Sequence, residues 1–484
     1  MNRQPDIIFV LSDQMRRDVC GPYGGRGIST PAMDRLAAEG MVVENAVSPT
    51  PVCTPYRGML MTGRYPTHSG VLNNFVEISP QQNPDPLAEV LAGAGYDTAY
   101  VGKWHLAAGE YGAATSHPSF VPPGPRRMGF RRWAAYNFHM DSTAYWYYRE
   151  VPEKEHDWRY ETDAIFAEAI RILRERPVDA PPLFMVIAPH APHPPFDADY
   201  APQGYLNRVP REIEWTPNVP PQNPRSAEEM RVYLAMVSNV DDNLGQLLGV
   251  IDELERNDDT FIVFTSDHGE MHGSHGRLNK MVPYSEAIDL PLLIRWPGIV
   301  PAGMRSKAVV TPMDFLPTLA TIAGAEAPPA LDGRNLSALL VGRQLPKDRE
   351  VLLANYSSHW NYFRSDTPDI APDWRCWPEW RGVRTMRYTY VRWLNGREEL
   401  YDNDADPFQL KNLFNHENSV APVAVDESTS TEDVVNRLRR TLDRLLAEAH
   451  DDFRPGNRYQ EWFDSERRLL STGLGPVDQA LGPL

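Results

Sequence analysis

Short apolar runs alternate with helix-like segments along the N-terminal part of the chain. Short runs of strand-forming residues predict strands at residues 7–11, 98–101, 183–188 and 260–265. Helical patterns, the last of them amphipathic, fall at residues 31–40, 87–95 and 228–255. Strands that alternate with helices are typical of a parallel α/β sheet. We therefore predict such a sheet, with helices around it, for this part of the chain.

Polar residues follow each of the four predicted strands. Asp13 comes after the first run, Lys103 after the second, and Asp267 after the fourth. The third run is followed by two candidates, His190 and His193. In open parallel sheets the C-terminal ends of the strands share one edge, and ligands bind there. We expect these four segments to build one site.

The rest of the chain has a different texture. Residues 118–158 are rich in Arg, Trp and Tyr and predict an excursion over the site, and residues 202–225 predict a Pro-rich loop. Beyond residue 352 we expect a strand at 384–393, a turn at 400–413, an exposed loop at 421–433 and an amphipathic helix at 434–453. This predicts a catalytic domain at residues 1–360 and a smaller α+β domain at residues 361–484.

Charge and composition narrow the classes of partner. The 484 residues carry a formal net charge of −17, which disfavours general attraction to nucleic acid or to anionic membranes. Local Lys and Arg side chains, or a metal ion, can still make a cleft attractive to an anionic small molecule. No stretch is apolar enough to span a bilayer. We therefore expect a small-molecule or oligosaccharide partner, and a homo-oligomer is compatible with the sequence.

The three cysteines are Cys20, Cys53 and Cys376, an odd and sparse set without a disulfide framework or a CxxC metal spacing. This set favours a reducing compartment. The N-terminus runs straight into the apolar run at residues 7–11, which is too short for the core of a signal peptide. We expect a cytoplasmic protein, although a trimmed leader for periplasmic export would leave the same sequence.

The run Cys53-Thr54-Pro55-Tyr56-Arg57, followed by Gly58 and by Thr62-Gly63-Arg64, has the form Cys-x-Pro-x-Arg-Gly with a Thr-Gly-Arg. By itself this run also fits a buried thiol at the start of a helix, with Pro55 in the first turn and Arg57 solvated. Other motifs along the chain decide whether Cys53 is a functional thiol or a plain buried one. In order along the chain they are Ser-Asp-Gln at 12–14, Thr-Pro at 30–31, Gly-Lys-Trp-His at 102–105, Pro-His-x-Pro near 189–195 and Ser-Asp-His-Gly-Glu at 266–270.

These ordered motifs resemble the sulfatases of the alkaline phosphatase superfamily, in which the Cys is oxidised to formylglycine. The resemblance runs from residue 6 to about 325, and Leu400-Tyr401-Asp402 resembles the C-terminal signature of the family. It implies an alkaline-phosphatase-like α/β sandwich, with a large mostly parallel sheet flanked by helices. It also implies an antiparallel sheet in the smaller C-terminal α+β domain. The pattern leans towards bacterial carbohydrate or alkyl sulfatases.

The same resemblance implies a metal site. Its ligands are Asp13, the modified Cys53, Asp267 and His268, with Gln14 at the position where many members have a second Asp. An amide there removes one negative charge from the ligand shell. We expect Ca²⁺, with Mg²⁺ or Mn²⁺ as alternatives, because all three accept oxygen-rich sites.

The resemblance also implies catalytic roles. Lys103 and Lys280 supply positive charge, Arg57 orients the formylglycine diol, and His105 takes a proton when sulfate is released. His193 is the preferred general acid, but His190 fits Pro-His-x-Pro equally well and stays open as a residue of the substrate site. Asn74 is expected to bind a sulfate oxygen, with Asn73 as the alternative in register.

The sequence contains few indications of which substrate the protein binds. The cluster Trp146-Tyr147-Tyr148-Arg149 and a second one, from His359-Trp360 through Trp374, Trp377, Trp380 and Arg381, could stack on sugar rings or pack internally. We expect a sulfuric ester hydrolase that depends on a formylglycine-generating maturation enzyme. A phosphonate monoester or phosphodiester hydrolase, and a non-catalytic carbohydrate-binding protein with unmodified Cys53, are the alternatives.

Overall fold

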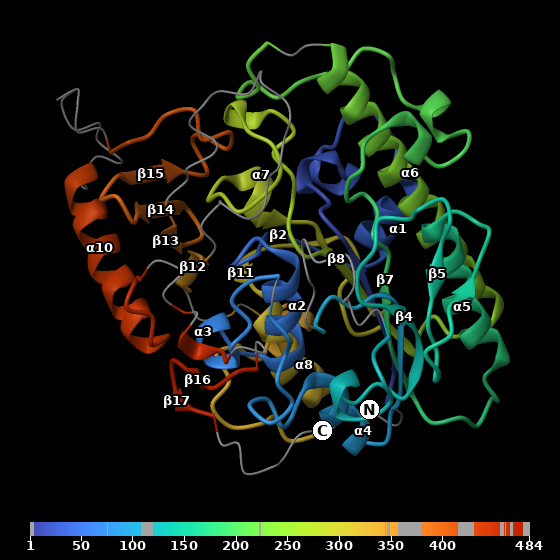
Figure 1. Ribbon diagram of the computed structural model, residues 1–484. Coiled ribbons are helices and arrows are strands. Elements are labelled where there is room, and N and C mark those ends of the chain that lie inside the picture. The colour runs from blue at the N-terminus through green and yellow to red at the C-terminus, as the bar shows by residue number, and fades with distance from the viewer. Residues whose placement is uncertain are drawn as a thin grey trace.

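The structure is a computed structural model, shown in Figure 1. It describes the chain except for residues 1–3, 75, 108–119, 222–223, 344, 346–348, 357–378, 415–429, 455–458, 460, 465–467 and 478–484. A nine-stranded sheet lies at the centre, a four-stranded sheet lies to one side of it, and helices cover both. The α/β architecture predicted from the sequence is confirmed.

The central sheet is mostly parallel. In spatial order its strands are β11 (Met304–Val310), β2 (Met41–Val47), β10 (Leu292–Arg295), β8 (Thr260–Ser266), β1 (Asp6–Ser12), β7 (Leu183–Ala188), β3 (Asp97–Lys103) and β4 (Arg132–Tyr136). The short β9 (Asp289–Leu290) pairs with β2. Within this sheet β10 runs antiparallel to both of its neighbours, and β9 runs antiparallel to β2.

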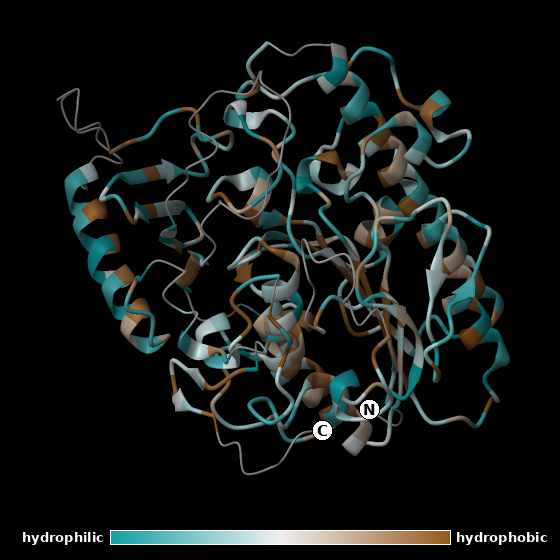
Figure 2. Ribbon diagram, viewed as in Figure 1, coloured by the Kyte–Doolittle hydropathy of each residue, from teal (hydrophilic) through white to brown (hydrophobic). Residues whose placement is uncertain are grey.

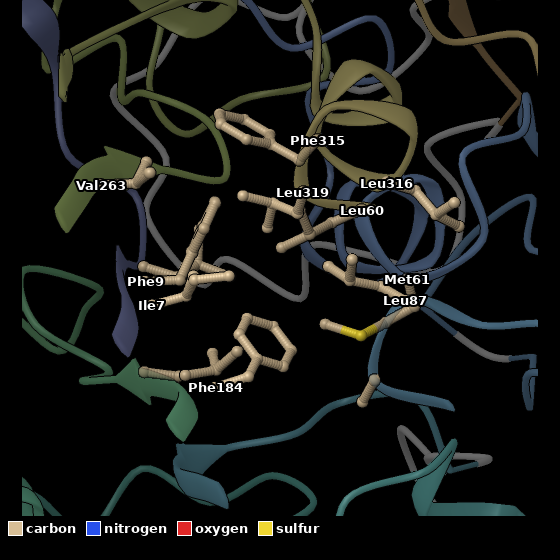
Figure 3. Close-up of a cluster of buried hydrophobic side chains, with 14 of the residues drawn as sticks. Ile7, Phe9, Leu60, Met61, Leu87, Phe184, Val263, Phe315, Leu316 and Leu319 are labelled. Atoms are coloured by element: carbon tan, nitrogen blue, oxygen red, sulfur yellow. The ribbon is translucent and has the colours of Figure 1, made fainter. Parts of the chain in front are cut away.

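Both faces of the sheet are covered, which explains why its strands read as continuous apolar runs. Alternate residues of β1 point to opposite sides. Ile7 and Phe9 join one buried cluster, shown in Figure 3, which includes residues of β7, β8, α2, α4 and α8. Ile8 and Val10 join a second cluster on the other face, with residues of α1, α5 and α6. The sheet is therefore the middle layer of a helix–sheet–helix sandwich.

The helices are α1 (Pro31–Glu39), α2 (Cys53–Thr62), α3 (Pro66–Ser69), α4 (Leu87–Gly93), α5 (Glu161–Glu175), α6 (Pro224–Glu253), α7 (Ser285–Ile288), α8 (Phe315–Ile322), α9 (Ser337–Leu340) and α10 (Thr431–Glu448). Short 3₁₀ turns lie at η1 (Arg17–Val19), η2 (Gly21–Tyr23), η3 (Pro125–Arg127), η4 (Ala198–Tyr200), η5 (Tyr205–Arg208), η6 (Ser274–Gly276) and η7 (Pro312–Asp314). In the described part of the chain, no helix is long and apolar enough to cross a bilayer.

The C-terminal sheet is antiparallel, as the resemblance implied. Its strands, in order, are β12 (Val351–Asn355), β13 (Trp380–Arg384), β14 (Tyr388–Trp393) and β15 (Glu398–Asp402). The amphipathic α10, banded teal and brown in Figure 2, packs its apolar side on one face of this sheet through residues such as Leu438. Leu353 and Trp380 on the other face pack against the main body. Two small ribbons, β5 (Trp146–Tyr147) with β6 (Glu155–His156) and β16 (Ser471–Thr472) with β17 (Gly475–Pro476), complete the fold.

Several local expectations need correction. The strand predicted at 384–393 begins later, at Tyr388, as β14; Arg384 is the last residue of β13, and the chain turns between the two strands. The turn predicted at 400–413 begins inside β15. The helix predicted at 434–453 starts earlier, since Ser430 caps it by accepting from the backbone N–H of Asp433, so residues 431–433 of the predicted loop are helical. The excursion at 118–158 contains β4, which pairs with β3 as an edge strand of the main sheet.

The four-stranded sheet begins at Val351, ahead of the predicted domain boundary at residue 360. The aromatic region predicted at His359–Trp377 lies outside the described residues. So do most of the loop predicted at 421–433 and the start of the excursion at 118–119.

Candidate active site

Four neighbouring parallel strands, β8, β1, β7 and β3, end at the same edge of the central sheet. Asp267 follows β8 directly, Asp13 follows β1, Lys103 ends β3, and His190 lies two residues beyond β7. The backbone N–H of Asp267 donates to the Ser12 carbonyl at 3.2 Å, which ties two of these ends together. The sheet therefore brings the predicted polar residues to one place.

Cys53 is the first residue of α2, a helix whose ten residues are all buried. Its Sγ lies 3.1 Å from Nε2 of His268, 3.6 Å from Nζ of Lys280 and 3.9 Å from Oδ1 of Asp13. Burial and the Asp13 carboxylate oppose ionisation of the thiol, but Lys103, Lys280 and His268 outweigh them and lower the pKa of Cys53. The thiol lies at the centre of the predicted residues and is not an isolated core cysteine.

Arg57, one turn further along α2, is buried and holds the carboxylates of the site. Its Nη2 donates to Oδ2 of Asp13 at 2.9 Å and to Oδ2 of Asp267 at 3.2 Å, and its Nη1 donates to the Lys103 carbonyl at 2.6 Å. The solvated Arg57 of the plain-helix alternative is therefore wrong. These contacts place the guanidinium behind the carboxylates, where it positions them.

Lys103 completes the surroundings of Asp13. Its Nζ lies 2.7 Å from Oδ2 of Asp13, and both side chains are fully buried. Burial alone would raise the pKa of Asp13, but Lys103, His193 and Arg57 hold it well below its usual range. Asp13 is therefore a permanent carboxylate whose Oδ1 faces Cys53.

The Gln14 side chain lies between Lys280 and Glu270. Nζ of Lys280 donates to its Oε1, and its Nε2 donates to Oε2 of Glu270. The other oxygen of Glu270 accepts from the backbone N–H groups of His272 and Asn279. Burial raises the pKa of Glu270. The Gln14 amide thus orients Lys280 towards Cys53, and its role as a metal ligand stays a prediction.

Three histidines surround Lys103 and Asp13. The rings of His190 and His193 stack with centroids 4.3 Å apart, and Nδ1 of His193 lies 2.9 Å from the Pro194 carbonyl. Because a carbonyl oxygen only accepts, this nitrogen carries the proton of the neutral ring. Burial lowers the pKa of all three rings, with Lys280 contributing at His193 and Lys103 at His190 and His105.

Some buried side-chain nitrogen atoms of this site lack a hydrogen-bond partner. Within the described residues Nε2 of His190, Nδ1 of His105 and Nε of Arg57 have no hydrogen-bond partner. A buried polar group left alone costs free energy, so the two histidine nitrogens are candidates for contact with a ligand.

Asn74 has a clear structural role. Its Oδ1 accepts from the backbone N–H of Thr54 at 2.9 Å, which satisfies a free donor in the first turn of α2. Oγ1 of Thr54 in turn donates to the His105 carbonyl at 2.8 Å. These contacts fix the start of the helix that carries Cys53. Binding of a sulfate oxygen by Asn74, or by Asn73, stays a prediction.

Two groups of buried side chains could offer ligand atoms to a metal ion, and a divalent cation fits the first of them. Asp13, Cys53, Asp267 and His268 each offer a ligand atom, and these atoms lie within 4.8 Å of one another. Nδ1 of His268 lies 3.0 Å from the Gly269 carbonyl and so carries the proton, which leaves Nε2 of the neutral ring free to bind a metal. Buried carboxylate oxygens of this kind suit a hard cation.

The second group of side chains, Asp13, His190 and His193, meets the same distance limit. It is unsuited to a second cation, because Lys103 already occupies Oδ2 of Asp13 and lies beside both rings. Anion binding is the better match for this side of the site.

The sequence reasoning missed two residues. Phe138, in the loop after β4, stacks on His105, and Glu161, the first residue of α5, is buried and accepts from the hydroxyl of Tyr136. Burial raises the pKa of Glu161 to about 8. Neither residue belongs to a motif, so their approach to the site depends on the pairing of β4 with β3 and on the packing of α5.

The first aromatic cluster is largely packing. Trp146 and Tyr148 are buried, and Trp146 lies against His139 and Tyr136. Arg149 is paired with Glu155 and Glu168. Of the second cluster, Trp380 and Arg381 are buried in the C-terminal sheet. The described members of both clusters are therefore mainly structural.

Comparison with known proteins agrees with this geometry. The Sulfatase family matches residues 5–325, and the family described as N-sulphoglucosamine sulphohydrolase, C-terminal, matches residues 273–436. The chain is similar to an ulvan-active sulfatase of Formosa agariphila, with 34% identity over 95% of this chain and 84% of that protein. It is also similar to an endo-4-O-sulfatase of Bacteroides thetaiotaomicron, with 28% identity over 92% of each chain.

A solved structure supports the same conclusion. A Bacteroides thetaiotaomicron protein, described in connection with glycosaminoglycan metabolism, superposes with a TM-score of 0.77 at 25% identity, over 94% of this chain and 98% of that one. The motifs, the sheet edge that gathers them and the family match over residues 5–325 lead to one conclusion. This chain belongs to the sulfatase family, whose enzymes hydrolyse sulfate esters.

Proposed function

We propose that this enzyme hydrolyses sulfate monoesters of carbohydrates, with residue 53 converted to formylglycine and a divalent cation, Ca²⁺, bound beside it. The observation that carries the proposal is the charge around Cys53. Three buried cations lie around it: Arg57 and Lys103 pair with the carboxylates of Asp13 and Asp267, and Lys280 lies beside the thiol itself. Positively charged side chains thus lie on several sides of residue 53, which suits a small anion such as a sulfate group.

Carbohydrate is favoured as the alcohol half of the ester by the similar proteins. One is named as active on ulvan, and another is named as an endo-4-O-sulfatase. Both resemble this chain over more than nine tenths of its length. Beside the buried cations lie the half-buried ring of Phe138 and the buried rings of His105, His190 and His193, which fits a sulfate group carried on a sugar ring.

Formylglycine would supply a hydrated aldehyde at residue 53, with one hydroxyl to attack sulfur and a second to expel sulfate afterwards. The chain prepares this position from two sides. His268 and Lys280 lie 3.1 Å and 3.6 Å from the present Sγ, and Asn74 fixes the backbone one residue on. Residue 53 is thus held against the positive charge that would lower the pKa of a hydroxyl there.

Lys103 and Lys280 would neutralise the sulfate oxygens as charge shifts in the transition state. Lys103 is anchored on Asp13, and Lys280 is anchored on Gln14, so neither must reorganise when substrate binds. Arg57 acts from behind, because it holds Asp13 and Asp267 in place. Calcium would be held by these two carboxylates, His268 and residue 53, and would polarise the sulfate group as a Lewis acid.

His193 is our candidate for protonating the departing alcohol. Its Nδ1 is fixed by the Pro194 carbonyl, so Nε2 is the nitrogen left to exchange a proton. Burial favours the neutral ring, and an arriving sulfate anion would favour its protonation. His190, stacked on it, has a buried Nε2 without a partner in the described chain and would bind a substrate oxygen. His105 remains the candidate for taking the proton at sulfate release.

The test is to produce the chain with and without a formylglycine-generating enzyme and to analyse the tryptic peptides by mass spectrometry. The Cys53 peptide is expected to carry the aldehyde only in the first preparation. Cys20 is a control within the same chain, because it is buried and lacks Cys-x-Pro-x-Arg, so it must stay a thiol.

Turnover should then follow the converted fraction for sulfated sugars and 4-nitrophenyl sulfate, and should be weaker for phosphonate monoesters. Equal turnover by the unconverted chain would refute the formylglycine mechanism. A preference for phosphonate monoesters would instead support the alternative hydrolase, and conversion without turnover of any ester would support the binding protein.

A further inference from the structure

Phe138 is an aromatic residue at the edge of the site that the proposed mechanism does not use. It lies two residues beyond β4, whose last residue, Tyr136, is paired with Lys103 at the end of β3. The intervening Asn137 is tied to the 105–107 segment. His105 N donates to its carbonyl at 2.9 Å, its Nδ2 donates to the Ala107 carbonyl at 2.8 Å, and Ala107 N donates to its Oδ1 at 3.1 Å. The backbone that carries Phe138 is therefore fixed.

The ring of Phe138 contacts four side chains of the proposed site, among them His193, the candidate for protonating the leaving alcohol, and its neighbour His190. It stacks on His105, with centroids 4.6 Å apart and an interplanar angle of 21°. It meets His190 and His193 edge-on at 5.7 Å and 6.2 Å, and Nζ of Lys103 lies 4.9 Å from its centroid. All four partners are buried, whereas Phe138 is half-buried. The ring is thus a partly open apolar surface in an otherwise charged site.

A sulfate group gains nothing from an apolar ring, but the organic half of the ester does. The C–H face of a sugar, or an aryl ring, can stack on an aromatic side chain. We propose that Phe138 forms the wall of the subsite for the leaving alcohol and discriminates in favour of sulfate esters of ring alcohols. This inference rests on the proposed function, because it assumes a sulfate ester bound between Lys103 and His193.

A different role is open to the same ring. Phe138 could simply shield Lys103 and His105 from water, which would strengthen every electrostatic contact in the site. The two roles predict different behaviour towards an anion without an organic half. Loss of a stacking surface affects only ring-bearing esters, whereas loss of shielding weakens the binding of inorganic sulfate as well.

The experiment compares the converted wild-type enzyme with Phe138→Ala and Phe138→Leu. The substrates are 4-nitrophenyl sulfate and N-acetylglucosamine 6-sulfate, and inorganic sulfate serves as a competitive inhibitor. For Phe138→Ala we expect KM for both substrates to rise about two- to twelve-fold with kcat nearly unchanged, since aromatic contacts have energies of that order. The inhibition constant of sulfate should stay within about two-fold. Phe138→Leu keeps the apolar bulk and should fall between wild type and Phe138→Ala.

Trp158→Ala is the matched control, because Trp158 is 85% exposed and stacks on His156. It should leave all these constants unchanged. A parallel weakening of sulfate inhibition in Phe138→Ala would overturn the proposal in favour of shielding, and unchanged KM values would overturn it outright. Both results differ from failure of the proposed function, in which the converted wild-type enzyme itself would hydrolyse no sulfate ester.

Discussion

Replacing Arg57 by Met removes the guanidinium that bridges the two buried carboxylates, Asp13 and Asp267. The side chain of Arg57 is 1% exposed, and those of Asp13 and Asp267 are fully buried. Methionine retains most of the apolar volume, so the main loss is positive charge together with the contacts to Asp13, Asp267 and the Lys103 carbonyl. The substitution therefore isolates the electrostatic role of the residue.

The contacts that Asp13 and Asp267 keep in the variant set the size of the expected loss in unfolding free energy. Removing one partner of a buried ion pair typically costs about 3–5 kcal/mol. Asp13 keeps Lys103 at 2.7 Å, and Oδ1 of Asp267 keeps the backbone N–H groups of Gln14 and His268 at 3.0 and 2.9 Å. We therefore expect the lower end, a loss of about 3 kcal/mol in unfolding free energy. Arg57→Lys retains the positive charge but lacks the several N–H donors of the guanidinium, and it should lose about 1–2 kcal/mol in unfolding free energy.

Urea unfolding in the presence of a chelator, monitored by tryptophan fluorescence, measures the unfolding free energy of both variants. Added Ca²⁺ should restore part of the stability of Arg57→Met, because a cation beside Asp13 and Asp267 replaces the lost charge. Arg26→Met is the control. Arg26 pairs with Glu214 at the surface, with 68% and 60% of the two side chains exposed, and should change stability by less than about 0.5 kcal/mol. If Arg57→Met were as stable as that control, the reasoning about the bridged carboxylates would be refuted.

Three further predictions follow from the same geometry. Burial raises the pKa of Asp241 to about 6, so its contribution to stability is present below pH 4 and is lost as pH rises through about 6. In urea titrations between pH 4 and 7, Asp241→Asn should lack up to about 3 kcal/mol of this pH dependence. Parallel plots of unfolding free energy against pH for the variant and the wild type would contradict this prediction. Chelation should lower the thermal midpoint of the wild type by several degrees but leave Asp267→Asn unmoved, whereas equal shifts would place the metal elsewhere. Cys53→Ala should abolish turnover yet unfold within about 1 kcal/mol of wild type, and a larger loss would tie folding to this side chain.

The sequence by itself determined the parts of this protein that depend on local pattern. The run Leu183–Ala188 is a strand with the predicted bounds, because a continuous apolar stretch between polar segments has few alternatives in a buried sheet. The polar residues after each run, Asp13, Lys103 and Asp267 among them, could be assigned to one sheet edge, because all parallel strands end on the same side.

The tertiary structure decided what those residues touch. Strands that begin at residues 260, 6, 183 and 97 become neighbours through long-range pairing, which no local pattern encodes. That pairing buries Arg57 against two carboxylates and turns Asn74 towards the backbone of Thr54. It also places Phe138 beside His105, because β4 joins the sheet next to β3. Burial, hydrogen-bond partners and pKa shifts depend on three-dimensional neighbours, so the sequence could name the chemical groups of the site, but only the fold assigned their contacts.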